Sequence, residues 1–439
     1  MRNNLLFSLN AIAGAVAHPS FPIHKRQSDL NAFIETQTPI AKQGVLNNIG
    51  ADGKLVEGAA AGIVSTIQNY VDSQAKQQAV SNPSGGLSDG SGLAEPKFYV
   101  NISQFTDSWG RPQRDGPALR ASALIAYGNS LISSDKQSVV KANIWPIVQN
   151  DLSYVGQYWN QTGFDLWEEV QGSSFFTVAV QHKALVEGDA FAKALGEECQ
   201  ACSVAPQILC HLQDFWNGSA VLSNLPTNGR SGLDTNSLLG SIHTFDPAAA
   251  CDDTTFQPCS SRALSNHKLV VDSFRSVYGI NNGRGAGKAA AVGRYAEDTY
   301  QGGNPWLWDK QGQVNVTETS LPFFKDLSSN VTTGSYAKSS SAYESLTSAV
   351  KTYADGFISV VQEYTPDGGA LAEQYSRDQG TPVSASDLTW SYAAFLSAVG
   401  RRNGTVPASW GSSTANAVPS QCSGGTVSGS YTTPTVGSW

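Results

Sequence analysis

The sequence predicts an all-α fold whose helices are joined by long loops. Two observations predict it. Apolar residues recur every three or four positions in several segments, as they do on one face of an α-helix. The segments between them are long and rich in Gly, Ser, Asn, Pro and aromatic residues. Because long loops in compact proteins usually serve a function, we expect the helices to form a scaffold and the loops to carry the site.

The N-terminal residues have the features of a secretory signal. Arg2 precedes an apolar run over residues 5–16 that ends in small residues and is too short to span a bilayer. We predict a signal peptide over residues 1–17 and a propeptide over residues 18–26, which ends in a dibasic pair. The mature protein then starts near Gln27 and is expected outside the cell, or in a vacuole. A disordered tail is the alternative.

The charge balance argues against a polyanionic partner. The first 26 residues hold three basic and no acidic residues, so the mature chain has 25 basic and 36 acidic residues, a formal net charge of −11. Such a chain is repelled by nucleic acids and by anionic membranes. We therefore expect neither as a partner. We also expect a monomer without a cofactor or a metal.

The cysteine count indicates an oxidising compartment. The chain has six cysteines, and an even number permits complete pairing. A zinc site at Cys199-x-x-Cys202 is the alternative, but no second Cys or His pair at ligand spacing follows it. Two of the bridges we expect would close short loops and the third would join distant parts of the chain. The expected pairs are Cys199–Cys202, Cys251–Cys259 and Cys210–Cys422.

The chain also carries six N-x-S/T sequons, the acceptor pattern for N-glycosylation. Any one of them could occur by chance, but together they suit a secreted surface. They are Asn101, Asn160, Asn217, Asn315, Asn330 and Asn403.

The clearest helical patterns lie in three segments. One follows Pro146, which suits the first turn of a helix, and another follows Ser386, which we expect to be its N-cap. The apolar positions are Val148, Leu152, Val155 and Trp159 in the first segment; Leu346, Val350, Tyr353, Phe357 and Val361 in the second; and Leu388, Tyr392, Phe395 and Val399 in the third.

Loops are expected over residues 81–97, 107–117 and 163–174. No shift in composition marks an interior domain boundary, so we expect a single domain over residues 27–423. Residues 424–439 are rich in Gly, Ser, Thr and Pro and are expected to form a tail or the start of a linker.

Two adjacent glutamates, Glu168 and Glu169, stand out in a chain with only 15% charged residues. Adjacent side chains diverge, so the two cannot easily act as facing acid and base on one bond. Leu166 and Trp167 offer apolar surroundings that favour the protonated form a general acid needs. The second carboxylate must come from elsewhere, and Glu373 in a Gly/Ala-rich loop is the candidate. Solvated surface charge is the alternative for all three glutamates.

Tryptophans accompany these glutamates. Several lie in expected loops or at helix ends near polar clusters, whereas a core would use more Leu and Ile. A sugar ring has one face rich in C–H groups and hydroxyls at its edge, so aromatic faces beside carboxylates and arginines suit carbohydrate. The tryptophans in question are Trp109, Trp159, Trp167, Trp306 and Trp390.

Four stretches resemble the catalytic domain of fungal glucoamylases, glycoside hydrolase family 15. They are residues 108–121 (SWGRPQRDGPALRA), 150–188 (including GFDLWEEVQGSS), 238–253 (LLGSIHTFDPAAACDD) and 387–398 (DLTWSYAAFLSA). The resemblance runs from about Leu46 to the C-terminus. It implies an (α/α)6 barrel with the active site in a pocket at one end. It also implies exo-acting hydrolysis of α-1,4 bonds, and more slowly α-1,6 bonds, that releases glucose with inversion from starch, glycogen and maltooligosaccharides.

The resemblance also assigns roles. Glu168 resembles the general acid, Glu373 the general base, and Asp165 a pocket aspartate sometimes given the role of base. Trp109 resembles the tryptophan that stacks on the substrate. Glu169 becomes a hydroxyl-binding neighbour of the acid rather than the second catalyst. The positions expected to line the pocket are Arg111, Leu166, Trp167, Glu169, Arg294, Ser384 and Trp390.

The chain departs from the family pattern in two places. The family carries a Tyr-x-Trp-x-Arg-Asp motif that grips the glucose, but here residues 58–64 run directly into residues 65–71. After Trp306, residues 303–312 lack an apolar helical stretch. Both breaks are abrupt, which is typical of omitted exons or a misdrawn gene model. We therefore expect a barrel lacking parts of two helices.

The departures leave alternative functions open. One is a catalytically impaired or inactive glucoamylase-like protein, because the Trp-x-Arg-Asp segment is missing. Another is a sugar-active barrel enzyme with a different linkage preference. No starch-binding domain is expected.

Overall fold

Helices dominate the computed structural model, which describes residues 29–48, 63–298, 313–435, 437 and 439. The expected signal peptide, the propeptide, Trp306 and the two breaks at residues 64/65 and 306/307 lie outside the described residues or at their edge. The α-helices are α1 (Leu30–Asn47), α2 (Ile63–Gln78), α3 (Gly116–Ile132), α4 (Gln137–Asn143), α5 (Trp145–Tyr158), α6 (Phe175–Leu195), α7 (Ala205–Leu212), α8 (Thr235–His243), α9 (Ser261–Ser273), α10 (Leu321–Leu327), α11 (Ser341–Tyr364) and α12 (Thr389–Arg402).

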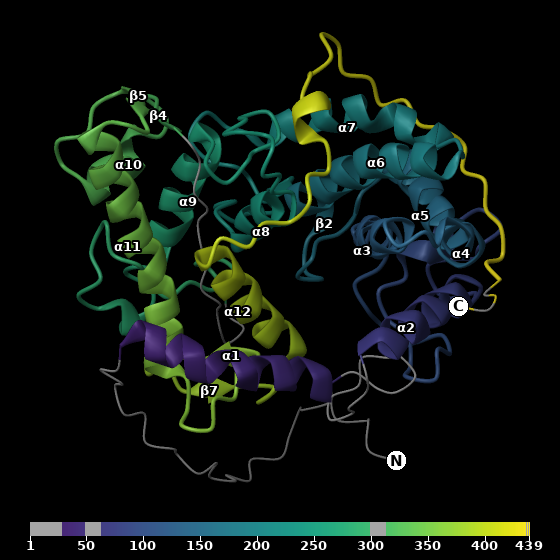
Figure 1. Cartoon of the computed structure of the whole chain (residues 1–439), viewed down its shortest axis with the longest axis horizontal. Coiled ribbons are helices and arrows are strands. Elements are labelled where there is room, and N and C mark those ends of the chain that lie inside the picture. Colours follow the sequence, from purple (N-terminus) through teal and green to yellow (C-terminus); the bar gives the residue numbers. More distant parts are fainter. Residues whose placement is uncertain (1–28, 49–62, 299–312, 436, 438) are drawn as a thin grey trace.

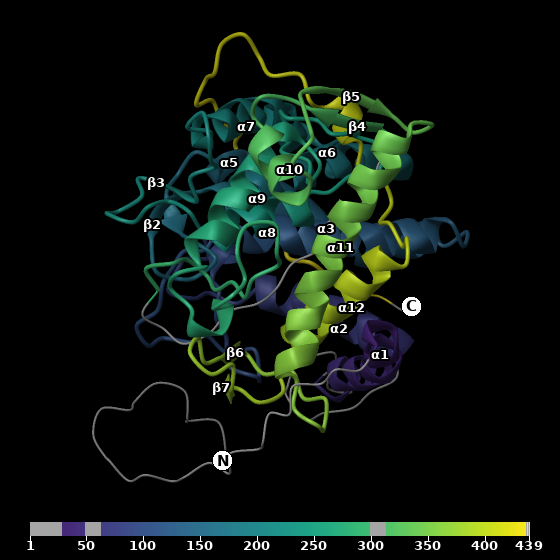
Figure 2. The same ribbon diagram turned by 90° about the vertical axis from the view of Figure 1, so that its left-hand side faces the viewer.

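The helices are arranged in a ring (Figure 1). α1 packs on α12 and α11, α11 on α10, α10 on α9, and α9 on α8. From α8 the ring continues through α6, which packs on α3, α5 and α7, and ends with α2 against α5. In the turned view α11 crosses the near face with α10 and α9 beside it (Figure 2). This ring agrees with the toroid of helices expected for an (α/α)6 barrel.

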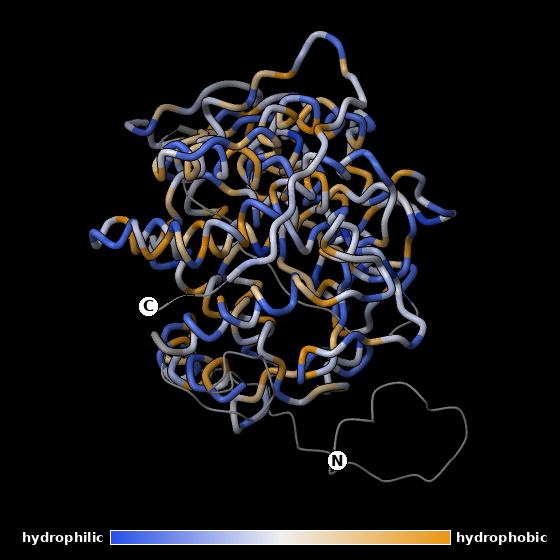
Figure 3. Tube along the Cα trace, turned by 90° about the vertical axis from the view of Figure 1, so that its right-hand side faces the viewer, coloured by the Kyte–Doolittle hydropathy of each residue, from blue (hydrophilic) through white to orange (hydrophobic). Residues whose placement is uncertain are grey.

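The apolar core is divided between the two sides of the ring. One large cluster joins α3, α5, α6 and α7, and a second joins α9, α10 and α11. A small cluster that includes Phe33 and Phe395 holds α1 against α12. Apolar and polar residues alternate along the helices, as expected for helices that bury one side (Figure 3). Trp159, which we expected near a site, is 5% exposed and belongs to the first cluster.

The three helical patterns are confirmed as α5, α11 and α12. Pro146 lies in the first turn of α5, where its missing N–H costs no hydrogen bond. The expected cap of α12 is wrong, because the helix starts at Thr389 with Leu388 as its N-cap. The backbone N–H of Leu388 donates to the carbonyl of Leu371, and the Ser386 hydroxyl donates to Asp387 Oδ2 over 3.5 Å rather than capping the helix.

The strands are short and lie in the loops. β1 (Gly163–Phe164), β2 (Gln171–Ser174) and β3 (Asn224–Leu225) form an antiparallel sheet beside the start of α6. β4 (Gln313–Val316) pairs with β5 (Gly334–Ala337), and β6 (Gln374–Tyr375) pairs with β7 (Pro382–Val383). Of the three expected loops, residues 81–97 contain one short 3-10 helix over Ser91–Ala94, residues 107–117 are irregular up to the start of α3, and residues 163–174 fold into the β1–β2 hairpin.

The C-terminal residues lie along the outside of the ring. Figure 1 shows them, in yellow, passing α5 and α4 towards α2. The backbone of Thr432 exchanges two hydrogen bonds with the Asn150 side chain, and the indole N–H of Trp439 donates to Asp72 over 3.1 Å. The expected tail is thus fastened to α5 and α2 through its described residues.

All six cysteines are paired as predicted: Cys199–Cys202, Cys210–Cys422 and Cys251–Cys259. The six sequon asparagines are all exposed, so each could carry a glycan without unfolding the chain around it. Among the described residues, no helix combines the length and the apolar character needed to cross a membrane.

The bridge between Cys210 and Cys422 should contribute most of the disulfide stabilisation. It closes a sequence separation of 212 residues, against 3 residues for Cys199–Cys202. The loop-entropy model gives about 5 kcal/mol for the long loop and about 2 kcal/mol for the short one. Replacing both cysteines of the long bridge by alanine should therefore lower the free energy of unfolding in urea more than the same change at Cys199 and Cys202. Equal losses would contradict the prediction.

Candidate active site

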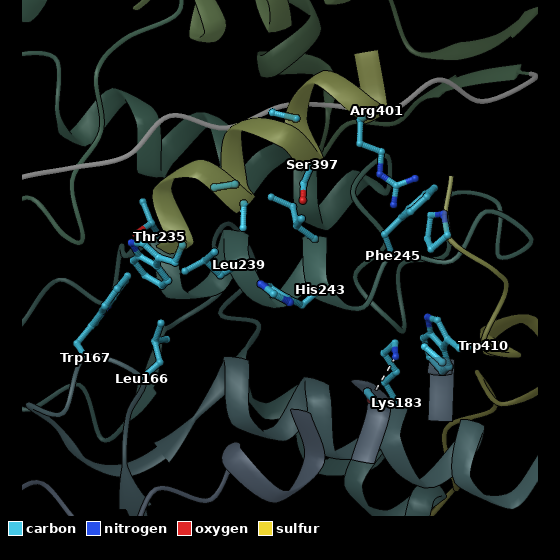
Figure 4. Close-up of a pocket in the computed structure, with 18 of the residues that line it drawn as sticks. Leu166, Trp167, Lys183, Thr235, Leu239, His243, Phe245, Ser397, Arg401 and Trp410 are labelled. Atoms are coloured by element: carbon cyan, nitrogen blue, oxygen red, sulfur yellow. Dashed lines mark hydrogen bonds between the residues drawn. The ribbon is translucent and has the colours of Figure 1, made fainter. Parts of the chain in front are cut away.

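A cavity of about 1540 Å³ lies within the ring. Loop residues line one part of it, and the inner faces of α3, α6, α8 and α12 line the rest. Figure 4 shows Leu166 and Trp167 on one side, with Phe245, Arg401 and Trp410 on the other. Most of the residues expected in the pocket meet here: Trp109, Leu166, Trp167, Glu168, Glu169, Arg294, Glu373 and Trp390.

The turn that follows β1 presents Glu168 to the cavity. The backbone N–H of Glu168 donates to the Asp165 carbonyl over 2.9 Å, and Glu168 has a φ of 64°. A side chain with a Cβ atom rarely adopts this left-handed conformation, so the surrounding contacts must hold it. The left-handed backbone of Glu168 costs conformational free energy, but it directs the side chain into the cavity.

Asp165 supplies those contacts. Its side chain is fully buried, and its Oδ1 accepts from the backbone N–H groups of Glu169 and Val170 at 3.0 and 3.2 Å. Its Oδ2 accepts from Asn224 at 3.1 Å, which ties the turn to β3. Asp165 does not line the cavity. The position of Asp165 therefore does not favour the expected role as the base. Asp165 instead holds the turn that carries Glu168.

Two side chains hold the carboxylate of Glu168. The indole N–H of Trp109 and the amide Nε2 of Gln113 both donate to its Oε1, each over 2.8 Å. Lys97 lies over the Trp109 ring, with Nζ 3.2 Å from the ring centroid. Burial lowers the pKa of Lys97, while the nearby charge of Glu168 acts to raise it. Trp109 thus contacts the carboxylate directly and presents an aromatic surface to the cavity.

Glu373 is distant from Glu168 in the sequence but lines the same cavity. It immediately precedes β6, and its backbone N–H donates to the Ala385 carbonyl over 2.7 Å. The hydroxyl of Ser384 donates to Glu373 Oε2, and Ser384 itself has a φ of 67°. Ser384 therefore acts through Glu373 rather than by lining the cavity, whereas its neighbour Ala385 does line it.

Glu169 is surrounded by positive and hydroxyl groups. Its Oε1 pairs with Arg294 at 2.8 Å, and its Oε2 accepts from Arg230 at 2.8 Å and from the Tyr295 hydroxyl. Burial alone would raise the pKa of Glu169, but the Tyr295 hydrogen bond and the charge of Arg294 outweigh it and lower the pKa. The side chain is thus a fixed negative acceptor at the cavity edge.

Asp234 holds Trp167, the residue next to Glu168. Its Oδ1 accepts from the Trp167 indole over 2.9 Å and from the backbone N–H of Asn236 over 2.7 Å, where it caps α8. Burial raises the pKa of Asp234 to about 7. One carboxyl therefore fixes both a helix start and an aromatic side chain of the cavity wall.

Not every residue predicted to line the pocket does so, and some residues of the site were not predicted. Arg111 does not line the cavity, because it forms an ion pair with the buried Glu95 at 3.1 Å and donates to backbone carbonyls of its own loop. Gln113, Lys97 and Asp234 were missed. Among the described residues, no group of three or more His, Cys, Asp or Glu could hold a metal ion.

The protonation of Asp234 predicts how stability depends on pH. Because its folded pKa of about 7 lies above the unfolded value near 4, its contribution is complete below about pH 4 and is lost as pH rises through 7. The loss is on the order of 4 kcal/mol. Asp234→Asn keeps both accepted hydrogen bonds but cannot titrate. Urea unfolding of the variant at pH 4, 5.5 and 7 should therefore show a smaller fall in stability than the parent.

A matched control is Asp189→Asn, since Asp189 is a partly exposed carboxylate on α6 paired with Lys193. This variant should keep the parent's pH dependence. An Asp234→Asn protein with the parent's slope would contradict the prediction.

Comparison with known proteins identifies the fold and the family. Residues 63–400 match the model for glycosyl hydrolases family 15. A glucoamylase of Neurospora crassa is 53% identical, with 95% of this chain and 76% of that protein covered. The solved family 15 glucoamylase of Hypocrea jecorina superposes with a TM-score of 0.89 at 51% identity, covering 93% of this chain and 78% of the other.

The glucoamylase structure of Hormoconis resinae gives a TM-score of 0.88 at 47% identity, covering 92% of this chain and 79% of the other. These structures are (α/α)6 barrels, which confirms the predicted fold class. The match spans the turn with Glu168, the hairpin next to Glu373 and the helices around the cavity. The chain belongs to glycosyl hydrolase family 15.

Proposed function

We propose that this chain is a glucoamylase, which hydrolyses starch and related α-glucans from their non-reducing ends and releases glucose. The proposal rests mainly on one observation: Glu168 and Glu373, from distant parts of the chain, line the same cavity. The relatives support it, since proteins named glucoamylase are 47–53% identical over most of this chain.

The two glutamates divide the chemistry. Glu168, in its protonated form, donates a proton to the glycosidic oxygen as the bond from C1 to that oxygen breaks. Glu373 removes a proton from a water that attacks C1 from the opposite face of the ring. The product is glucose of inverted, β configuration, as in glycosidases that use one acid and one base. Ser384, hydrogen-bonded to Glu373, orients the base.

The cavity wall binds the sugar. Trp109, Trp167 and Trp390 offer aromatic faces for the C–H-rich side of a glucose ring. Glu169 and Arg294, paired at 2.8 Å, supply an acceptor and donors for hydroxyls. Asp165 positions Glu168 through the backbone of the turn and takes no part in proton transfer. This division explains why Glu169, although next to the acid, is not the second catalyst.

We further propose that the protein is secreted, acts as a monomer and can be glycosylated, with no nucleic acid or membrane as a partner. Three disulfides and six exposed sequons support an extracellular protein. Mass analysis of the protein from culture medium, before and after enzymatic deglycosylation, tests this part.

Replacement of either glutamate by glutamine should abolish most turnover. Glu168→Gln keeps the hydrogen bonds to the side chain oxygen but cannot donate the proton, and Glu373→Gln cannot accept one. We expect kcat on maltose to fall by about 10²–10⁴-fold in each, without loss of the folded state. Glucose release and circular dichroism are measured on both. Near-normal kcat in Glu168→Gln would remove it as the acid.

Gln113 and Trp109 should separate positioning from binding. Each donates one hydrogen bond to Glu168 Oε1. Gln113→Leu removes that bond and a 3.2 Å bond to the Gly110 carbonyl, so we expect kcat to fall by about 10–100-fold with little change in KM, since a hydrogen bond to a charged group is worth about 1.5–3 kcal/mol. Trp109→Leu also removes an aromatic surface and should raise KM as well. The same kcat and KM in both variants would contradict this division.

A further inference from the structure

A serine, a histidine and an aspartate are joined by hydrogen bonds outside the large cavity. The Ser173 hydroxyl lies 3.0 Å from His211 Nε2, and His211 Nδ1 lies 3.0 Å from Asp214 Oδ2. None of these three residues, the serine cluster, lines the cavity that holds the two glutamates. The proposed glucan hydrolysis therefore gives the serine cluster no role.

The order of the atoms gives each side chain of the serine cluster a different part. An ionised carboxylate only accepts hydrogen bonds, so Asp214 accepts from His211 Nδ1 and the neutral ring carries its proton there. The lone pair of Nε2 then faces the Ser173 hydroxyl. A hydroxyl that donates to an imidazole, which in turn donates to a carboxylate, is the arrangement that activates serine as a nucleophile.

His211 is held from several sides. It lies in the last turn of α7, and its neighbour Cys210 is bridged to Cys422. The rings of Trp159 and Phe215 flank the imidazole, with their centroids 6.1 and 5.6 Å from its own. The C-terminal end of a helix favours positive charge, which the imidazole carries while it holds the serine proton. The base is thus fixed in place and stabilised in the state that the reaction needs.

The two partners of His211 are fixed by secondary structure. Ser173 lies in β2, the central strand of the short sheet, whose backbone pairs with β1 and β3. Asp214 follows His211 by three residues in the 3-10 turn after α7, so the two side chains lie on the same side of the chain. The side-chain amide of Gln213 donates to two backbone carbonyls and anchors this turn. The three reacting groups therefore come from rigid elements.

The serine cluster is open to small molecules. Ser173 is half-buried, whereas the side chains of His211 and Asp214 are 28% and 61% exposed. Sites that hold large ligands are enclosed and bury most of the ligand surface, and an open site cannot do so. The exposure therefore suits a small acyl ester with a good leaving group, which reacts without extensive binding.

We propose that the serine cluster is a second catalytic site, independent of the proposed glucoamylase activity, that hydrolyses small acyl esters. Ser173 Oγ forms a bond to the ester carbonyl carbon while His211 Nε2 takes the hydroxyl proton. The bond from that carbon to the alcohol oxygen then breaks, and the alcohol leaves with this proton. Water attacks the acyl-serine by the same route, which releases the carboxylic acid and restores the hydroxyl. Asp214 is a positioning residue that acts through His211.

Labelling with a small fluorophosphonate, which traps activated serines, tests the proposal on the 439-residue protein. We expect one phosphonyl group per chain, located at Ser173 by tandem mass spectrometry. Ser173→Ala should abolish the label, and His211→Gln should slow labelling by about 10²–10⁴-fold, the usual contribution of a positioned base. Asp214→Asn should slow it by up to about fivefold, because an exposed pair contributes little. An unlabelled parent, or a His211→Gln variant that reacts at the parent's rate, overturns the proposal.

Turnover of p-nitrophenyl acetate separates catalysis from a merely structural hydrogen bond. We expect the parent and Ser133→Ala to release p-nitrophenol at equal rates, and Ser173→Ala only at the uncatalysed rate. Ser133 is the matched control, because its exposed hydroxyl donates to the Asn129 carbonyl rather than to an imidazole. Glucose release from maltose should be the same in all three proteins, so this proposal and the glucoamylase proposal can fail separately. Equal ester hydrolysis by the parent and Ser173→Ala contradicts the second site.

Discussion

The hydrogen bonds that Asp165 accepts from the backbone of Glu169 and Val170 determine the site, because they hold the turn from which Glu168 points into the cavity. Glu168 has a left-handed backbone that its side chain disfavours, at a cost of order 1–3 kcal/mol. Hydrogen bonds to a buried carboxylate contribute about 1.5–3 kcal/mol each and can offset that cost. Trp109 and Gln113 then fix the carboxylate, and Asp234 fixes the adjacent Trp167.

Local patterns in the sequence predicted much of the fold and part of the site. Helical spacing identified α5, α11 and α12, and the cysteine order predicted all three bridges. The glutamates and three of the tryptophans were found as unusual residues in polar loops and placed by family resemblance. The prediction that Trp159 lies near a site was wrong, because a tryptophan at a helix end can belong to the core as readily as to a site. Gln113 and Asp234 gave no signal, since their roles depend on contacts with residues about 55 and 67 positions away.

The cavity is lined by charged side chains, among them Lys183, Arg294 and Arg401, as well as by apolar ones. Charged groups keep their water or pair with a polar ligand, so the cavity is a place for water and substrate and not a dry void in the core. The proposed catalytic residues are held by their own loop contacts, independent of the inner faces of α3 and α12.

The account centres on Glu168 and Glu373 acting from opposite faces of one sugar ring. Its most direct test is the anomeric form of the first glucose released, followed by proton NMR during the early turnover of soluble starch, whose reducing ends are too few to contribute glucose. An acid and a base that act across the ring invert the configuration, so β-glucose should appear first and then mutarotate. Release of α-glucose as the first product would contradict the account.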